Sequence, residues 1–201
     1  DVTIQTQAIS NSDNYISING GVREMAISPN GREITFIARG EVFVTSVDGA
    51  MTKRITNTPE QERFVEFGPD GKSIIYSSER NGKWQIFESK KVRAEEPFFF
   101  ASTLLKEEVL ISKEVDVYLP KLSPDGKKLG YIEDRRTLKI LDLTTKEEVT
   151  LLTPDQLFHM RDGDQYFTWS PDSKWILASY SPTMVNSEVV LLDATGKMPM
   201  R

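Results

Sequence analysis

The sequence contains no cysteine and only one histidine, and both shortages exclude whole classes of site. Without cysteine there is neither a disulfide framework nor a thiolate for catalysis or zinc binding. His159 is the sole candidate base for a Ser-His-Asp triad, and its place in a connection between repeats indicates a solvated or hydrogen-bonded loop residue. Motifs such as Gly-x-Ser-x-Gly, His-Glu-x-x-His and glycine-rich phosphate loops are missing. We therefore predict no catalytic residue, no cofactor-binding residue, no metal ligand and no cofactor.

Long apolar runs and clusters of basic residues are missing as well. No apolar stretch approaches the roughly 18 residues of a membrane span. Residues 1–10 have neither the basic nor the apolar region of a secretory signal. Lys and Arg number 25 against 30 Asp and Glu, giving a net charge of −5, and no dense basic run is present. We therefore expect no membrane span and no nucleic-acid partner, because phosphate binding needs a clustered basic surface.

What the sequence does contain is a turn motif that occurs four times. The copies are Ser28-Pro29-Asn30-Gly31, Gly68-Pro69-Asp70-Gly71, Ser123-Pro124-Asp125-Gly126 and Ser170-Pro171-Asp172-Ser173. Proline presets φ for the first corner, Asp or Asn bonds nearby backbone N–H groups, and Gly accepts the positive φ that closes the turn. The prolines are 40, 55 and 47 residues apart, intervals that bracket one four-stranded propeller blade.

Apolar strands flank each copy of the turn, and a second turn follows. Asn81-Gly82 is the strongest of these second hairpin signals. No segment has a sustained helical period. We therefore predict an all-β β-propeller of about four four-stranded antiparallel blades, part of a larger six- or seven-bladed propeller. A β-sandwich is the competing fold, but a fixed turn motif at blade-sized intervals favours the propeller.

The whole chain, residues 1–201, is predicted to be one propeller segment. Its expected divisions are a leading outer strand (1–22), a blade (23–60), a blade with an insertion (61–117), a blade (118–160) and an incomplete blade (161–201). The alternating residues 1–9 either complete the last blade or belong to an upstream blade, and we favour the second reading. We expect the chain to be a piece of a longer protein.

The insertion in the second repeat lies between Lys90 and Tyr118 and contains Phe98, Phe99 and Phe100. These residues form either an exposed contact patch or, as we favour, an outer strand packed under a neighbouring blade.

Three other residue sets invite a functional reading. Asp162 and Asp164 have a spacing that suits calcium, but the other ligands of a calcium loop are missing, so we favour turn-forming roles. The three tryptophans, Trp84, Trp169 and Trp175, are expected to be core residues rather than stacking platforms. The charged pairs Glu79-Arg80 and Arg135-Arg136 are expected at solvated hairpin tips.

The block from Ile27 to Phe36 resembles the WD40-like PD40 repeat of the TolB and tricorn propellers. Residues 39–44, 54–59 and 163–172 are similar to the N-terminal propeller region of bacterial tricorn-like peptidases of the S41 class. The resemblance implies propellers that precede a PDZ domain and a serine-peptidase core and that filter or guide peptides. No catalytic residue carries over. Gly68 in place of Ser and Ser173 in place of Gly depart from the repeat, and Ser173 is expected to strain its turn.

The resemblance thus implies a non-catalytic propeller segment of a tricorn-like serine peptidase, with the catalysis elsewhere in the parent chain. The alternative is a TolB-like protein-interaction propeller in a cell-envelope complex, and an independent enzyme or ligand-binding propeller is the least favoured. Expected partners are a peptide or protein and the PDZ and peptidase domains of the parent chain. The expected compartment is the periplasm or cell envelope, otherwise the cytoplasm.

Overall fold

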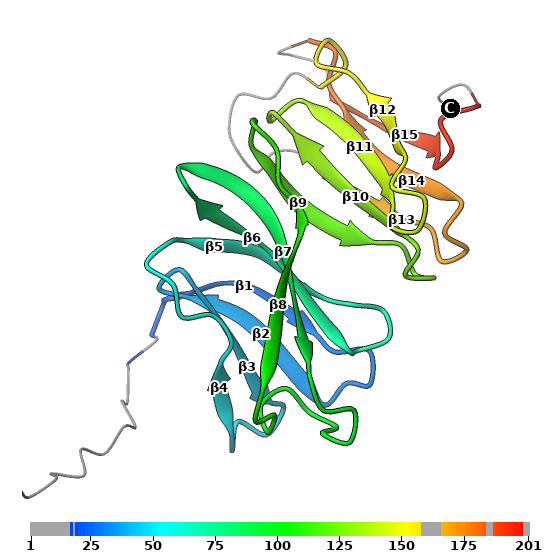
Figure 1. The fold of residues 1–201 in the computed structure, drawn as a ribbon. Helices are drawn as coiled ribbons and strands as arrows, with labels where there is room; N and C mark the ends of the chain where they lie inside the picture. Colours follow the sequence, from blue (N-terminus) through cyan, green and yellow to red (C-terminus); the bar gives the residue numbers. More distant parts are fainter. Residues whose placement is uncertain (1–16, 18, 158–165, 184–186, 199–201) are drawn as a thin grey trace, which may run out of the picture.

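The computed structural model describes residues 17, 19–157, 166–183 and 187–198, and these form fifteen β-strands without a helix. The strands make four separate antiparallel sheets that follow one another along an arc (Figure 1). The first three sheets pack beside one another through their first strands, as the contacts of β1 (Val22–Ile27) with β5 (Glu62–Phe67) and of β5 with β9 (Val117–Leu122) show. This arrangement confirms the predicted all-β propeller and excludes a two-sheet sandwich.

The first two blades each contain four strands in sequence order. Blade 1 consists of β1 (Val22–Ile27), β2 (Glu33–Ala38), β3 (Glu41–Ser46) and β4 (Thr52–Arg54). Blade 2 consists of β5 (Glu62–Phe67), β6 (Ser73–Arg80), β7 (Lys83–Lys91) and β8 (Leu105–Ile111).

Blade 3 again has four strands, whereas the described part of blade 4 has three. Blade 3 consists of β9 (Val117–Leu122), β10 (Lys128–Glu133), β11 (Thr137–Asp142) and β12 (Glu148–Leu152). Blade 4 consists of β13 (Phe167–Trp169), β14 (Trp175–Tyr180) and β15 (Glu188–Asp193). The proposed strand in residues 1–9 lies outside the described residues.

The repeated turn joins the first and second strand of every blade. In the first copy the Ser28 Oγ accepts a hydrogen bond of 2.9 Å from the backbone N–H of Glu33, which locks the turn to the strand that follows. Ser123 and Ser170 accept the equivalent bond from Lys128 (2.9 Å) and Trp175 (3.0 Å). Gly68 has no hydroxyl to offer, and the Ser73 Oγ occupies the space where a Cβ on Gly68 would lie.

Turns of consecutive blades touch one another on the same face of the arc. A Cβ on Gly71 would lie 3.6 Å from the Cδ of Pro29 in the preceding turn. At the fourth turn Ser173 replaces glycine at a φ of 61°, the left-handed region that costs a side chain energy. Its Oγ accepts a 3.1 Å hydrogen bond from the backbone N–H of Asp125 in the preceding turn. The departure from the repeat therefore strains the turn, as expected, and also links blades 3 and 4.

Three apolar cores lie between consecutive blades rather than within them. The core between blades 1 and 2 includes Val44, Tyr76 and Phe99, and the core between blades 2 and 3 includes Ile86 and Tyr131. The third core lies between blades 3 and 4.

The tryptophans belong mainly to the third core. Trp84 and Trp169 are half-buried and pack against it, as expected for core aromatics. The Trp169 Nε1–H also donates a 2.9 Å hydrogen bond to the carbonyl oxygen of Lys121 on blade 3. Trp175 is half-buried on β14.

The insertion of blade 2 corrects one prediction. Phe98, Phe99 and Phe100 lie in the loop of residues 92–104 between β7 and β8, not in an outer strand. The loop nevertheless packs against the neighbouring blade, because the ring of Phe99 is completely buried in the core between blades 1 and 2. We call residues 92–104 the plug loop. The outer strand is β8, which begins after it.

Candidate functional site: the groove between blades 2 and 3

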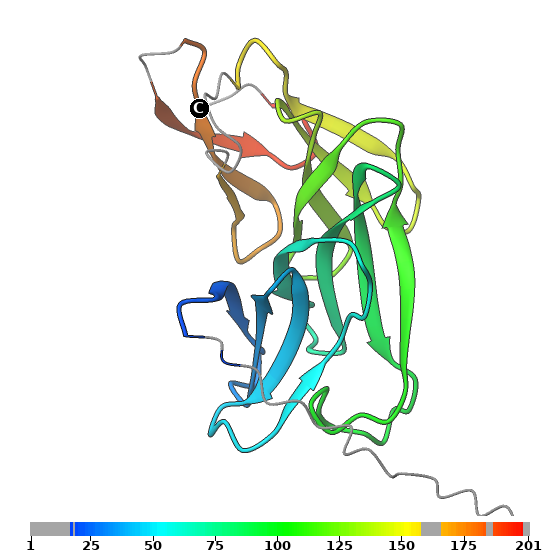
Figure 2. The same ribbon diagram turned by 90° about the vertical axis from the view of Figure 1, so that its left-hand side faces the viewer.

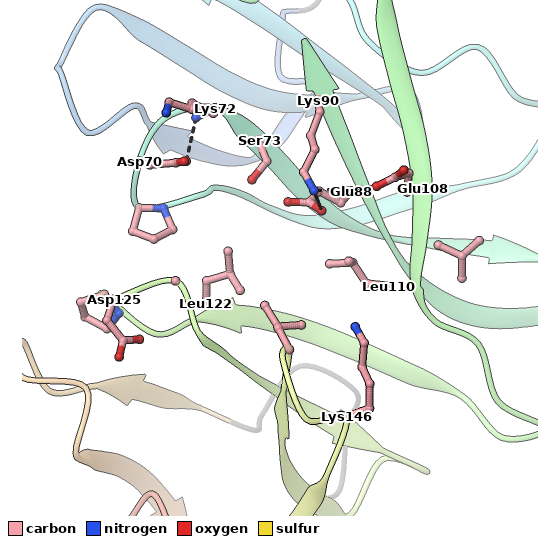
Figure 3. A pocket seen from close by; sticks show the side chains of 15 residues that line it. Asp70, Lys72, Ser73, Glu88, Lys90, Glu108, Leu110, Leu122, Asp125 and Lys146 are labelled. Carbon is pink, nitrogen blue, oxygen red and sulfur yellow. Dashed lines mark hydrogen bonds and ion pairs between the residues drawn. The ribbon is translucent and has the colours of Figure 1, made fainter. Parts of the chain in front are cut away.

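A large cavity lies in the wedge between blades 2 and 3. The inner strand β9 of blade 3 packs closely against β5, β6 and β7 of blade 2. The outer strand β8 continues beyond this contact, so the outer parts of the two blades stand apart. A groove with a cavity volume of about 880 Å³ lies between them (Figure 3). We call it the open groove.

The open groove has charged walls and an apolar floor (Figure 3). Leu110 and Leu122 form the floor, both packed against the buried core between the blades. The blade 2 wall carries Glu88, Lys90 and Glu108. The remaining lining includes Asp70, Lys72, Ser73, Asp125, Leu143 and Lys146.

The wall charges are arranged as a short network. The Lys90 Nζ lies 2.7 Å from a Glu88 carboxylate oxygen and 3.8 Å from one of Glu108. The Glu88 hydrogen bond raises the pKa of Lys90, so Lys90 stays charged. The Lys106 Nζ lies 2.6 Å from the other Glu108 oxygen, and this contact lowers the pKa of Glu108. The Glu108 carboxylate and the Lys90 ammonium are therefore both available to a bound molecule in their ionised forms.

A second, smaller cleft of about 530 Å³ lies between blades 1 and 2, at the ends of the inner strands opposite the repeated turns. Arg23, Arg39 and Arg63 line it together with Glu24. The Arg63 Nε lies 3.0 Å from a Glu24 oxygen, which joins β5 to β1. The ion pair serves the interface between blades 1 and 2.

The carboxyl group of Glu62 borders that cleft but is buried. Glu62 has no exposed surface, and its Oε1 accepts hydrogen bonds from the hydroxyls of Thr58 (2.8 Å) and Ser78 (2.9 Å). Burial raises the pKa of Glu62, and the nearby Glu41 carboxylate adds to the effect. A shifted pKa is common in catalytic groups, but a buried carboxyl group hydrogen-bonded to the hydroxyls of Thr56, Thr58 and Ser78 serves the packing of blades 1 and 2.

In the described part of the chain, no group of three or more His, Asp or Glu side chains is placed to hold a metal ion. None of its segments forms a helix able to cross a membrane. His159, Asp162 and Asp164 lie outside the described residues.

Two side chains of the charged pairs expected at solvated hairpin tips, Arg80 and Arg136, make contacts within the protein. Arg80 ends β6, and its Nη2 lies 3.0 Å from a Glu107 oxygen on β8. Its guanidinium also stands 3.9 Å from the centroid of the Phe87 ring. Arg136 donates a 3.3 Å hydrogen bond from Nε to the carbonyl oxygen of Leu157. The expectation is correct for Glu79 and Arg135, which are exposed, and Arg135 and Arg136 lie in the turn between β10 and β11 as predicted. It was wrong for the side chains of Arg80 and Arg136, which are half-buried because they fold back over their own blades.

Sequence reasoning missed the open groove because its lining comes from distant positions that only the fold brings together. Two sequence signals pointed towards it. Lys106, Glu107 and Glu108 form a charged run within an otherwise apolar stretch, as an outer strand facing water does. The connection from β11 to β12 is also much shorter than that from β7 to β8.

Comparison with known proteins identifies the fold but not a family. No family model and no curated protein matches the sequence. Among solved structures, TolB from Acinetobacter baumannii superposes with a TM-score of 0.66 at 20% identity, over 88% of this chain and 41% of TolB. A putative TolB from Agrobacterium tumefaciens gives a TM-score of 0.67 at 16% identity, over 88% of this chain and 60% of that protein.

Tricorn protease is also similar. It gives a TM-score of 0.64 at 17% identity, over 89% of this chain and 16% of the protease. The chain therefore spans less than two thirds of each of these proteins. At such identities the likeness establishes the arrangement of strands alone. By fold, the chain is a β-propeller of the kind found in TolB and in tricorn protease.

Proposed function

We propose that this chain is a non-catalytic binding segment of a larger propeller, which guides or filters peptides for a tricorn-like serine peptidase. The observation that carries the proposal is the open groove of about 880 Å³ with an apolar floor and charged walls, on a fold shared with tricorn protease. Grooves of this composition suit extended peptides, because the floor accepts side chains while the walls meet backbone groups.

The larger propeller is supported by the exposed apolar residues at both ends of the arc. Met25 and Ile27 on β1 are 61% and 59% exposed, and Val189 on β15 is 69% exposed. In the interior of the arc the corresponding blade surfaces are covered by a neighbour. Further blades of a six- or seven-bladed ring would cover these two surfaces as well.

A TolB-like protein-interaction propeller is the second candidate. It is favoured by the larger share of the TolB proteins that this chain matches. Under the first reading the partners are peptides and the PDZ and peptidase domains of the parent chain. Under the second they are whole proteins of a cell-envelope complex. The compartment we propose is the periplasm or cell envelope, with the cytoplasm as the alternative.

Peptide binding by the chain tests what both readings share. The chain is immobilised and exposed to a random peptide library, and the retained peptides are sequenced by mass spectrometry. We expect retained peptides of intact length. Failure to retain any peptide contradicts the proposal, and cleavage of the peptides by this chain alone contradicts its non-catalytic part.

An assay on the whole protein that contains this chain distinguishes the two readings. Fluorogenic peptides are incubated with it, and hydrolysis is followed over time. Hydrolysis that depends on an intact propeller supports the peptidase reading. Retention of a partner protein without hydrolysis supports the TolB-like reading.

A further inference from the structure

The interface between blades 1 and 2 contains a wedge equivalent to the open groove, and there the wedge is filled. The plug loop enters it from blade 2 and buries the ring of Phe99, which contacts Phe67 on β5 edge-on at 6.0 Å between centroids. The backbone N–H of Phe99 donates a 2.6 Å hydrogen bond to the Glu33 carboxylate of blade 1. The Lys91 Nζ lies 4.9 Å from the centre of the Phe99 ring.

Each of these residues that contact Phe99 has an equivalent in the open groove, at the same position relative to the repeated turn. Counting from the repeated turn, Leu122 on β9 corresponds to Phe67 on β5. Ser73 begins β6 and pairs with Lys90, as Glu33 begins β2 and pairs with Ser46. By the same register Leu143 corresponds to Lys91. The equivalents Leu122, Ser73 and Leu143 all line the open groove.

The open groove lacks a plug because the chain of blade 3 is too short to supply one. In blade 2 the connection from β7 to β8 runs from 92 to 104, long enough to fold back over the wedge. In blade 3 the connection from β11 to β12 is a tight turn in which Lys146 has a φ of 63°. The Asp142 carboxylate accepts hydrogen bonds from the N–H groups of Thr144 and Thr145 at 2.9 Å each, which holds this turn closed.

The two wedges differ in charge in a way that specifies the occupant. In the filled wedge Lys53 on β4 donates a hydrogen bond to the Ser102 carbonyl of the plug loop. The loop itself is acidic, with Glu95 and Glu96 ahead of its phenylalanines. Lys53 pairs with Val44 on β3, and Glu108 pairs with Glu88 on β7. These two pairs are equivalent in the register of the blades, so Glu108 stands where Lys53 stands in the filled wedge. The lysine that meets the acidic loop in the filled wedge is thus replaced by a glutamate in the open groove, beside Glu88 and Lys90.

We infer that the open groove binds an extended segment of another protein that carries an aromatic residue close to a lysine or arginine. The aromatic ring lies on Leu122, as Phe99 lies on Phe67. The basic side chain pairs with Glu108, in competition with Lys106 and Lys90. This inference rests on the proposed binding function and names its site and the chemistry of its ligand.

The plug loop itself supplies the probe. A fluorescent nonapeptide, Lys-Lys-Pro-Phe-Phe-Phe-Ala-Ser-Thr, copies residues 95–103 with the two glutamates replaced by lysine. Its affinity for the whole chain is measured by fluorescence anisotropy. The parent peptide with two glutamates and a peptide with the central phenylalanine replaced by alanine serve as matched controls. We expect each control to bind about tenfold more weakly.

Two variants of the chain locate the binding. Glu108→Lys restores the charge that Lys53 provides in the filled wedge, and we expect it to reverse the preference in favour of the glutamate peptide. The matched control is Glu114→Lys, which removes the same charge from a side chain that is 99% exposed and does not line the groove. We expect this control to keep the preference for the lysine peptide.

Several outcomes overturn the inference. Equal binding of all three peptides excludes recognition of the aromatic and basic groups, and an unchanged preference in Glu108→Lys places the ligand elsewhere. Stronger binding of the glutamate peptide to the unaltered chain indicates the plug loop of a second copy as the occupant. If the chain retains library peptides but not the lysine peptide, the inference fails while the proposed function stands. If it retains no peptide at all, the proposed function fails.

Discussion

Two interfaces of the molecule, between blades 1 and 2 and between blades 2 and 3, are built from equivalent strands. They differ in what lies between the outer strands of the blades. Both contain a buried tyrosine from the second strand of the later blade, Tyr76 in one and Tyr131 in the other. The first interface continues outward through Phe99 of the plug loop, whereas the second opens into the groove (Figure 2 shows the arc from the side). The repeat thus determines the inner half of each interface, and the length of one connection determines the outer half.

The largest expected effect is the loss of the plug. Phe99→Ala removes a completely buried ring, and we expect a loss of about 3–5 kcal/mol in the free energy of unfolding. Leu122→Ala, at the floor of the open groove, truncates a half-buried side chain and should cost clearly less. Urea denaturation of the two variants gives the comparison. Equal losses would mean that the two interfaces do not differ in packing.

The carboxyl group under the plug should show an effect of intermediate size. Glu33→Ala leaves the N–H groups of Phe99 and Phe100 without their acceptor, and we expect a loss of about 1–3 kcal/mol. Glu33→Gln keeps an acceptor oxygen in place and should lose much less at neutral pH. A loss from Glu33→Gln as large as that from Glu33→Ala would show that the negative charge, rather than the hydrogen bonds, holds the plug.

The difference in stability between the wild type and Glu33→Gln should depend on pH, in a direction that the pKa shift of Glu33 determines. Burial raises the pKa of Glu33 above its ordinary value of 4.5, although the N–H groups of Phe99 and Phe100 and the charge of Lys91 oppose the shift. The folded state therefore binds the proton more tightly than the unfolded state. This contribution is present below pH 4.5 and is lost as pH rises through the folded pKa. Thermal denaturation across this range should show the wild type losing stability relative to Glu33→Gln as pH increases.

The smallest effect concerns the third interface, between blades 3 and 4. Ser173→Ala keeps the strained φ of 61° and removes the acceptor for the Asp125 N–H, so we expect a loss of about 1 kcal/mol. Ser173→Gly removes the same acceptor but relieves the backbone, and we expect it to be nearly neutral. Denaturation midpoints of the two variants measure the difference. A glycine variant as unstable as the alanine variant would show that strain contributes nothing here.

Local turn chemistry made most of the fold predictable. Asn81-Gly82 was correctly read as a hairpin turn, and both residues adopt the positive φ that such a turn requires, 55° and 71°. The repeated turns likewise indicated the strands on either side of them. The outer strand β8 was missed because Glu107 and Glu108 interrupt its apolar alternation. These charges are satisfied across the sheet and at its edge, by Arg80 and Lys106, which no local pattern reveals.

The open groove was beyond sequence reasoning for a different reason. Glu88 and Leu122 lie in different blades, and their approach depends on how two sheets pack. The burial of Phe99 was equally hidden, because its main partners, Glu33 and Phe67, lie far away in the sequence. Three adjacent phenylalanines suggested packing, but only the fold shows that the middle one enters the core while its neighbours stack on each other at 4.9 Å.

The contacts between successive repeated turns also bear on how such a protein can gain or lose a blade. At the joints between the first three turns a proline meets a glycine of the next turn, Pro29 with Gly71 and Pro69 with Gly126. A copy of blade 2 therefore contains both halves of this joint. The Ser173 turn meets the main chain of Asp125 through a hydroxyl, so duplication of its blade would carry a different joint between two blades.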